Sequence, residues 1–391
     1  MREFRRLVEV PGRSFFLFGP RGVGKSFWLR RALESRRVFD LLDTRLQLEF
    51  ARAPYLLEAR IGEVEPGAWI WLDEVQKVPA LLDEVHRLME TRGLRFALSG
   101  SSARKLLRQG ADLLAGRAIT RRMEPLCSRE LADAFDVRAS LEWGCLPLVV
   151  GDPSNARDIL TSYVHTYIRE EVREEGLVRK IEPFLRFLEV AGMMNGRVLN
   201  AENVARDAQV PRRSVVSYFE ILEGTLMGHR LPAWQPRIAV REVAHPKFYW
   251  FDPGVARAAA GMAFEAADPS WLGFSLETLV FHELRVHNHV AARECRIAYY
   301  RTRAGAEVDF VIESRRGTGD RKPQVVLVET KLAKRWDRSW ESAMRHVAAS
   351  GKVEVAGMYG VYLGESSYRF DDVKVLPVRE FLDAVHGDRV F

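Results

Sequence analysis

One stretch decides the fold class of this 391-residue chain: Gly19-Pro20-Arg21-Gly22-Val23-Gly24-Lys25-Ser26. It matches the pattern G-x-x-x-x-G-K-[ST] and lies between an apolar run at residues 13–18 and a helical segment at residues 27–35. The glycines let backbone N–H groups face phosphates, and the start of the following helix adds a positive dipole end. We therefore predict an α/β domain that binds ATP through this loop and Phe27. Lys25 is expected to reach the β and γ phosphates, and Ser26 to bind Mg²⁺.

A second motif is Trp69-Ile70-Trp71-Leu72-Asp73-Glu74, an apolar run that ends in two carboxylates. This is typical of a buried parallel strand with its functional groups at the carboxyl end. An isolated Asp-Glu pair would indicate only the first turn of a helix, where acids are favoured. Because a phosphate-binding loop precedes this Asp-Glu pair in the chain, we predict that Asp73 holds Mg²⁺ and that Glu74 activates the attacking water.

The next apolar run spans residues 94–98, and two candidate site residues, Ser99 and Arg117, come after it in the chain. The run ends in Ser99-Gly100-Ser101-Ser102, and the Ser99 hydroxyl is expected to contact the γ-phosphate or the water; the alternative is a plain turn of small residues. Arg117 is a candidate catalytic arginine that acts across a subunit boundary. Its alternative is a solvated arginine at a helix end, and Arg121 and Arg122 are nearby.

Composition indicates a globular protein of several domains. The net charge of +6 and the pI near 9.2 permit contact with nucleic acid without requiring it. The three cysteines, Cys127, Cys145 and Cys295, are far apart, which argues against a zinc site of the usual spacing and against a disulfide framework. No apolar run approaches the roughly 18 residues that span a bilayer. A reducing cytoplasm and no membrane contact are expected.

Residues 200–222 have the outline of a helix-turn-helix. A short helix capped by Asn200 is followed by a break at 209–211 and a second helix from residue 212. Helical spacing turns four apolar side chains of the second helix toward the core: Val215, Val216, Phe219 and Leu222. The outward positions are then Arg212, Arg213, Ser217 and also Tyr218, and the first three are candidate DNA contacts. Runs at 226–234 and 248–251 could form a wing; the alternative is a helical pair used only for packing.

The C-terminal part, from residue 273, alternates helix and strand. A helix at 274–290 carries Glu277, a strand carries Asp309, and the next strand ends in Glu329-Thr330-Lys331. Residues i and i+2 of a strand share a face, so Glu329 and Lys331 point together, beside Asp309 if these strands pair.

This arrangement predicts a divalent metal site. Asp309 and Glu329 would hold Mg²⁺, Lys331 would position a water or stabilise charge, and Glu277 would complete the site. Without metal the three acids would repel one another, and one pKa should rise. The alternative is a strand-end ion pair of small energetic consequence.

These motifs together resemble a prokaryotic family of AAA-type ATPases that carry a C-terminal domain called DUF4143. The family also shares five further markers: Ala115-Gly116-Arg117, Gly144-Cys145-Leu146-Pro147, residues 247–254, Tyr300-Arg301-Thr302-Arg303 and Glu307-Val308-Asp309. Ser99 and Cys145 depart from the usual Thr and Gly. The resemblance implies an AAA-like sheet and a homo-oligomer. The last domain resembles the PD-(D/E)xK nuclease fold, with Thr330 in place of the usual apolar middle residue; domains of this fold can lose cleavage and keep only binding.

We therefore expect an AAA-like P-loop ATPase core at 1–127, a helical lid at 128–194, a winged helix-turn-helix at 195–262 and a PD-(D/E)xK nuclease-like domain at 263–391. The predicted function is a Mg²⁺-dependent ATPase that acts on DNA and couples ATP to the nuclease-like domain. The alternative is an ATP-gated regulatory or scaffold protein that binds DNA or protein, with an inert last domain. A protein-remodelling ATPase would need an exposed aromatic pore loop, which the sequence does not identify.

Overall fold

The computed structural model describes residues 3–33, 36–101, 106, 114, 116–168, 170, 180–235, 245–302, 305–319 and 321–391. Ser102, Ala115, Arg303 and residues 171–179 of the expected lid lie outside these ranges. The chain forms two compact units. One contains residues 5–125 with 221–227, and the other contains residues 126–220 and 228–391 with Glu3 and Phe4.

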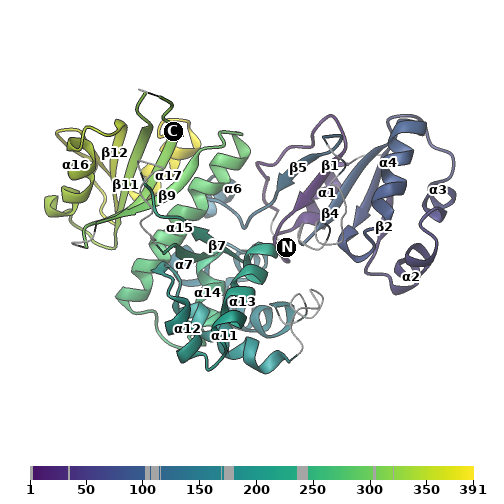
Figure 1. Cartoon of the computed structure of the whole chain (residues 1–391), viewed down its shortest axis with the longest axis horizontal. Coiled ribbons are helices and arrows are strands. Elements are labelled where there is room, and N and C mark those ends of the chain that lie inside the picture. The colour runs from purple at the N-terminus through teal and green to yellow at the C-terminus, as the bar shows by residue number, and fades with distance from the viewer. Residues whose placement is uncertain are drawn as a thin grey trace. The chain divides into compact units, whose positions relative to one another are not determined.

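The first unit is built on a five-stranded parallel sheet in the order β2-β3-β4-β1-β5 (Figure 1). Its strands are β1 (Phe15–Phe18), β2 (Arg36–Asp40), β3 (Trp69–Asp73), β4 (Arg95–Gly100) and β5 (Ile119–Arg122). The helices of this unit are α1 (Lys25–Ala32), α2 (Thr44–Arg52), α3 (Leu56–Ile61) and α4 (Leu81–Arg92), of which α4 contacts β4. All four residues of β1 are buried, as expected for a strand covered on both faces. The sheet therefore brings the ends of β1, β3 and β4 to one edge, where the predicted phosphate motifs lie.

The second unit begins with a helical region and a small sheet. The helices are α6 (Ser128–Leu131), α7 (Val137–Trp143), α8 (Pro147–Gly151), α9 (Ala156–Ser162), α11 (Ile181–Met193), α12 (Ala201–Asp207), α13 (Arg212–Gly224, with its residues from 221 onward assigned to the first unit) and α14 (Pro253–Ala259). Short 3-10 helices are η1 (Val75–Lys77) in the first unit and η2 (Ala132–Ala134), η3 (Pro153–Asn155) and η5 (Arg338–Glu341) in the second, and η4 (Tyr163–Ile168) is a π-helix in the second unit. Strands β6 (Arg197–Val198), β7 (Gly228–Leu231) and β8 (Lys247–Trp250) form an antiparallel sheet in the order β6-β8-β7.

The expected helix pair at residues 200–222 is present as α12 and α13, but one face of α13 was predicted wrongly. Asn200 caps α12 and accepts from the backbone N–H groups of Glu202 and Asn203. Val216 was expected in the core and is exposed, whereas Tyr218 was expected outside and packs against Phe184 with a ring separation of 5.1 Å. Val216 follows the buried Val215 by about 100° around the helix, which takes it off the apolar stripe.

The unit ends in a six-stranded mixed sheet in the order β13-β14-β12-β11-β10-β9. Its strands are β9 (Arg296–Arg301), β10 (Glu307–Arg315), β11 (Gln324–Lys331), β12 (Glu354–Tyr362), β13 (Tyr368–Phe370) and β14 (Val373–Pro377). Helix α16 (Ser342–Ala349) packs with β10, β11 and β12, while α15 (Pro269–Val290) contacts β11 and α17 (Val378–His386) contacts β12 and β14. Two separate apolar cores fill the space on either side of the sheet.

The two acid-bearing strands pair, which was the condition for placing Asp309 beside Glu329. β10 and β11 run antiparallel with Phe310 opposite Val328, so Asp309 and Glu329 are neighbours across the ladder. Within the described ranges, no helix combines the length and apolarity that crossing a membrane requires.

Candidate functional site

The phosphate-binding loop has a backbone that its glycines make possible. Gly22 and Gly24 have φ angles of 81° and 94°, in the left-handed region that favours glycine. At Gly19, a Cβ atom would lie 2.1 Å from the carbonyl oxygen of Met123. Lys25 is buried, and its ammonium donates to the carbonyls of Gly19 at 2.7 Å and Pro20 at 3.0 Å. The lysine is therefore held against the loop that is expected to bind phosphate.

Other predicted members of the loop differ in exposure. Val23 is completely buried and fixes the loop to the core, whereas the Phe27 side chain is 47% exposed. Arg21 is half-buried. Arg6, which the sequence analysis did not single out, donates to the carbonyls of Val23 at 2.9 Å and Glu124 at 2.5 Å. Arg6 belongs to none of the motifs, because its contacts with Val23 and Glu124 span 17 and 118 positions of the chain.

Asp73 is the point where three predicted residues meet. One carboxylate oxygen accepts from the Ser26 hydroxyl at 2.7 Å, and the other accepts from the Ser99 hydroxyl at 2.5 Å. Ser99 in turn accepts from the indole N–H of Trp71 at 2.7 Å. The structure thus brings together Ser26 and Asp73, the two residues expected to hold Mg²⁺, and it places Ser99 as a support for Asp73.

Glu74 lies beside this group in an unusual backbone conformation. Its φ of 57° is positive, which is uncommon for a residue with a side chain and occurs often at functional sites. Gln76 donates its amide to the Glu74 carboxylate and, at 3.1 Å, to the Ser101 hydroxyl. Burial raises the pKa of Glu74, with Lys25 opposing and Asp73 reinforcing that shift. Gln76 was missed by the sequence analysis, although its place two residues after Glu74 was a usable signal.

Arg117 has a partner within its own unit. Its guanidinium donates to the Glu90 carboxylate at 2.7 Å, and both side chains are largely exposed. An exposed ion pair of this kind contributes little stability. This geometry is that of a solvated arginine. The guanidinium is exposed, so a second subunit could contact it.

The candidate DNA contacts lie at the start of α13. Arg212 and Arg213 are exposed and Ser217 is half-buried. Arg212 forms an ion pair of 2.7 Å with Glu202 of α12. The two arginines are available at the surface, and the ion pair holds one of them beside the shorter helix.

In the C-terminal domain the predicted acids surround a lysine that the sequence analysis did not assign. Lys247, the first residue of β8, is buried and lies 3.1 Å from a Glu277 oxygen and 3.9 Å from an Asp309 oxygen, and it also contacts Glu307. Tyr249 donates its hydroxyl to Glu277 at 2.7 Å. The signal was a lysine at the start of an apolar strand, within a stretch that was noted only as a family marker.

The other half of the cluster lies on β10 and β11. The second Asp309 oxygen accepts from the Thr330 backbone N–H and from its hydroxyl, each at 2.8 Å. Lys331 contacts one oxygen of Glu329. The other oxygen, Glu329 Oε2, is buried and has no hydrogen-bond partner among the described residues. Thr330, at the position where the nuclease pattern has an apolar residue, therefore anchors Asp309.

The expected rise in an acid's pKa is present, with burial as its main cause. Burial raises the pKa of Glu277 to about 7, with Asp309 adding to the effect and Lys247 opposing it. Burial and then Asp309 raise the pKa of Glu329 well above its ordinary value. For Lys247, burial lowers the pKa, but Tyr249 and the neighbouring acids outweigh that effect and keep the ammonium charged.

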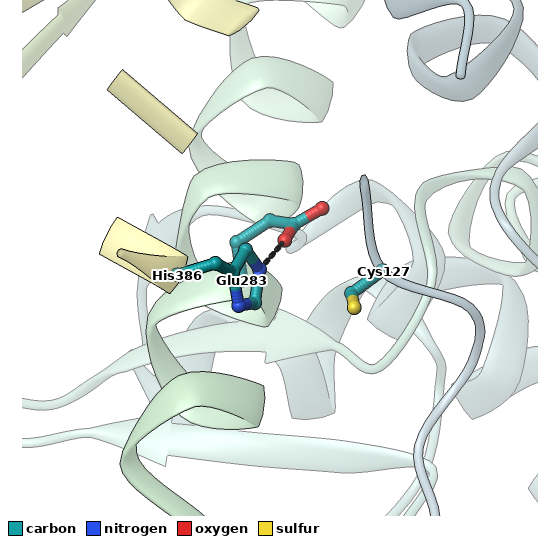
Figure 2. A group of neighbouring side chains, drawn as sticks. All are labelled: Cys127, Glu283 and His386. Carbon is teal, nitrogen blue, oxygen red and sulfur yellow. Dashed lines mark hydrogen bonds and ion pairs between the residues drawn. The ribbon is translucent and has the colours of Figure 1, made fainter. Parts of the chain in front are cut away.

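A third cluster lies in the same unit, where Cys127, Glu283 and His386 meet from three distant parts of the chain (Figure 2). Their ligand atoms lie within 4.8 Å of one another. The Glu283 carboxylate already accepts from the Ser128 N–H at 2.7 Å, the Ser128 hydroxyl at 3.0 Å and His386 Nε2 at 2.5 Å. Three hydrogen bonds satisfy this fully buried acid, so the cluster is explained by its role in joining α6, α15 and α17.

Three family models match consecutive parts of the chain. The model described as AAA domain matches residues 12–132, and two domains of unknown function, DUF8612 and DUF4143, match residues 134–266 and 272–381. The N-terminal part is thus an AAA-type P-loop domain. The chain as a whole carries this domain ahead of a DUF8612 and a DUF4143 domain, which confirms the expected AAA and DUF4143 resemblance.

No curated protein matches the sequence. Among solved structures, the Orc1 protein of Aeropyrum pernix in complex with DNA is similar at 16% identity and a TM-score of 0.27, covering 66% of this chain and 88% of its own. A mutant RuvB of Thermotoga maritima is similar at 15% identity and a TM-score of 0.30, covering 56% of this chain and 82% of its own. TM-scores this low carry no conclusion about function.

Proposed function

We propose that this protein is a Mg²⁺-dependent ATPase that acts on DNA, with a nuclease-like C-terminal domain whose action depends on ATP. The observation that carries the ATPase part is the joint placement of Lys25, Ser26, Asp73 and Glu74 at one edge of the parallel sheet. The AAA domain match over residues 12–132 supports the same activity.

The residues at this edge divide the work of hydrolysis. The loop at residues 19–27 and the Lys25 ammonium would hold the phosphates, and Ser26 and Asp73 would hold Mg²⁺, which neutralises charge on the phosphate oxygens. The raised pKa of Glu74 makes it a better proton acceptor than an ordinary carboxylate, which suits a residue that activates water. Gln76 fixes the Glu74 carboxylate through its amide.

The DNA part of the proposal rests on the middle region. α12, α13 and the sheet β6-β8-β7 have the outline of a winged helix, with Arg212 and Arg213 exposed at the start of α13. The N-terminal end of such a helix is the part that commonly reaches DNA. The net charge of +6 supports contact with a polyanion.

The C-terminal residues fit a divalent cation at one atom in particular. Glu329 Oε2 is buried without a hydrogen-bond partner among the described residues, and Asp309 is its neighbour across the ladder. Asp309 and Glu329 would hold the ion, which would polarise a phosphodiester, and Lys331 would stabilise charge there. We propose a nuclease-like role for this domain on that basis.

A second candidate function has its own support. The ammonium of Lys247 already contacts Glu277, Glu307 and Asp309. A domain whose acids are in contact with a lysine in place of a metal ion can bind without cutting. The protein would then be an ATP-gated regulatory or scaffold protein that binds DNA or another protein.

One experiment separates these candidates. The purified protein is incubated with single-stranded, double-stranded and branched DNA, with and without ATP, in Mg²⁺ or Mn²⁺. The first candidate predicts products that require ATP and disappear in Asp309→Ala and Lys331→Ala. Binding without products in every condition favours the second candidate, and absence of both binding and products removes DNA from the proposal.

A further inference from the structure

Lys247 is the best-buried cation near the C-terminal acids. Its side chain is 4% exposed, while that of Lys331 is 30% exposed. It belongs to β8, in the small sheet, whereas its acidic neighbours belong to α15 and β10. The acids of α15 and β10 therefore contact one ammonium group that belongs to a different sheet of the same compact unit.

These contacts leave few acid oxygens open to an ion. Lys247 engages Glu277, Glu307 and Asp309 Oδ1, and Thr330 engages Asp309 Oδ2 with two hydrogen bonds. On the next strand, Lys331 occupies Glu329 Oε1. Glu329 Oε2 is left buried and unpartnered among the described residues. One carboxylate oxygen is thus open to a cation, whereas the neighbouring Asp309 has one oxygen hydrogen-bonded to Thr330 and the other 3.9 Å from the Lys247 ammonium.

We propose that the Lys247 ammonium is an internal cation that competes with a divalent metal for Asp309, so that the C-terminal site takes up metal only when Lys247 is displaced. This inference rests on the proposed metal site at Asp309 and Glu329. It adds that Lys247 controls whether that site binds metal. Lys247 is a positioning and gating residue here, because it acts on the acids.

The competition follows from geometry and charge together. A small divalent ion binds carboxylate oxygens at about 2.0–2.1 Å in near-octahedral geometry, whereas an ammonium accepts looser contacts. Lys247 has an Asp309 oxygen at 3.9 Å and a Glu277 oxygen at 3.1 Å, so it lies among the same oxygens that an ion would need. A second cation in that space would meet the ammonium as a like charge in a buried setting, where screening by water is weak.

The acids also lack the spacing of a formed metal site. Among the described residues, the three-ligand group with atoms within 4.8 Å of one another is Cys127, Glu283 and His386, and the C-terminal acids do not form such a group. Loss of the ammonium would leave Asp309 beside other acids without its nearest cation, and a bound divalent ion would relieve their repulsion. Removing Lys247 should therefore create affinity for metal.

The test counts bound Mn²⁺ directly. Full-length protein carrying Asp73→Asn, which removes the metal ligand of the ATPase domain, is titrated with Mn²⁺ without nucleotide while free Mn²⁺ is followed by electron paramagnetic resonance. We expect the added Lys247→Met change to tighten the binding of one ion by roughly tenfold or more. Further addition of Glu329→Gln should abolish this gain.

Two variants keep the result interpretable. Lys247→Arg retains a cation and should show no gain, which separates loss of charge from general disturbance of the site. If Lys247→Met does not fold, Lys247→Met with Glu277→Gln restores the charge balance and leaves Asp309 and Glu329 to bind, so the same gain is expected.

Two outcomes overturn the proposal. One is tight binding of an ion by the Asp73→Asn protein with Lys247 intact, lost in Asp309→Asn. The other is a folded Lys247→Met variant with no gain in Mn²⁺ affinity. Because no DNA is present, a failure of the DNA function would leave this result unaffected.

Discussion

At the scale of single residues, adjacent carboxylates in the ATPase domain have different surroundings. Asp73 accepts hydrogen bonds from Ser26 and Ser99, while Glu74 has a raised pKa and a single amide donor, Gln76. The first environment suits a metal ligand and the second suits a base. In the proposed mechanism, this difference would separate metal binding from hydrolysis.

The first prediction follows from that separation. Glu74→Gln keeps the size and the contact with Gln76 but removes the basic oxygen, so kcat for ATP should fall about 100-fold or more while nucleotide affinity is retained. Lys25→Ala should instead weaken nucleotide binding. Affinity is measured with a fluorescent ATP analogue and turnover by phosphate release. Wild-type turnover in Glu74→Gln would remove this residue from the mechanism.

Sequence alone predicted the residues whose spacing along the chain carries the signal. Lys25, Asp73 and Glu74 lie in contiguous motifs, whereas the sequence left the pairing of the strands that carry Asp309 and Glu329 as a condition that the structure meets. Lys247 was not predicted as part of the site, because its contacts with Glu277 and Asp309 join residues that lie 30 or more positions apart. Arg6 was missed for the same reason.

At the scale of elements, the buried helix cap Asp252 gives a structural role to the loop at residues 144–147, for which the sequence indicated none. Asp252 caps α14 by accepting from the Val255 N–H at 3.0 Å and reaches across to accept from the Cys145 N–H at 2.7 Å. Gly144 has a φ of 77°, and a Cβ there would lie 2.0 Å from an Asp252 oxygen. The loop before α8 is therefore locked to the start of α14.

The second prediction tests this lock. Gly144→Ala should lower the free energy of unfolding by about 2 kcal/mol or more, since it combines a strained backbone with a steric clash. Asp252→Ala should lower it by a similar amount, because it removes a cap and leaves a buried N–H unpaired. Urea unfolding measures both. Gly261→Ala is a control, since it shares the positive φ but meets no atom within 4 Å.

The third prediction concerns α13 as a reader of DNA. Arg212→Ala with Arg213→Ala should weaken DNA binding and reduce the slope of log affinity against log salt by about 2, because each phosphate contact releases counterions. Fluorescence anisotropy at several salt concentrations gives the slope. Arg206→Ala is a matched control on α12, where the arginine is exposed and paired with Asp207. An unchanged slope in the double variant would favour a helix pair that serves only packing or protein contact.

At the scale of the whole molecule, the open question is whether one subunit completes the ATPase site of another. Arg117 lies in the same unit as the phosphate-binding loop, but its described partner is Glu90 on α4. If the arginine only forms this exposed pair, its loss should change little, since such pairs contribute at most about 1 kcal/mol. If it reaches the nucleotide of a neighbouring subunit, its loss should lower kcat by about a thousandfold.

The last prediction uses mixed subunits to decide between these roles. Arg117→Ala protein has intact Glu74, and Glu74→Gln protein has intact Arg117, so each alone should be nearly inactive. In a ring of head-to-tail contacts, random mixing in equal amounts pairs an intact Glu74 with a neighbour's intact Arg117 at about a quarter of the boundaries. We therefore expect activity to return on mixing, in a proportion that follows the ratio of the two proteins. Glu90→Ala should stay active, because it removes the ion pair and keeps the guanidinium. No return of activity from mixed assemblies of normal size, together with an equal loss in Glu90→Ala, would assign Arg117 to the surface of its own subunit.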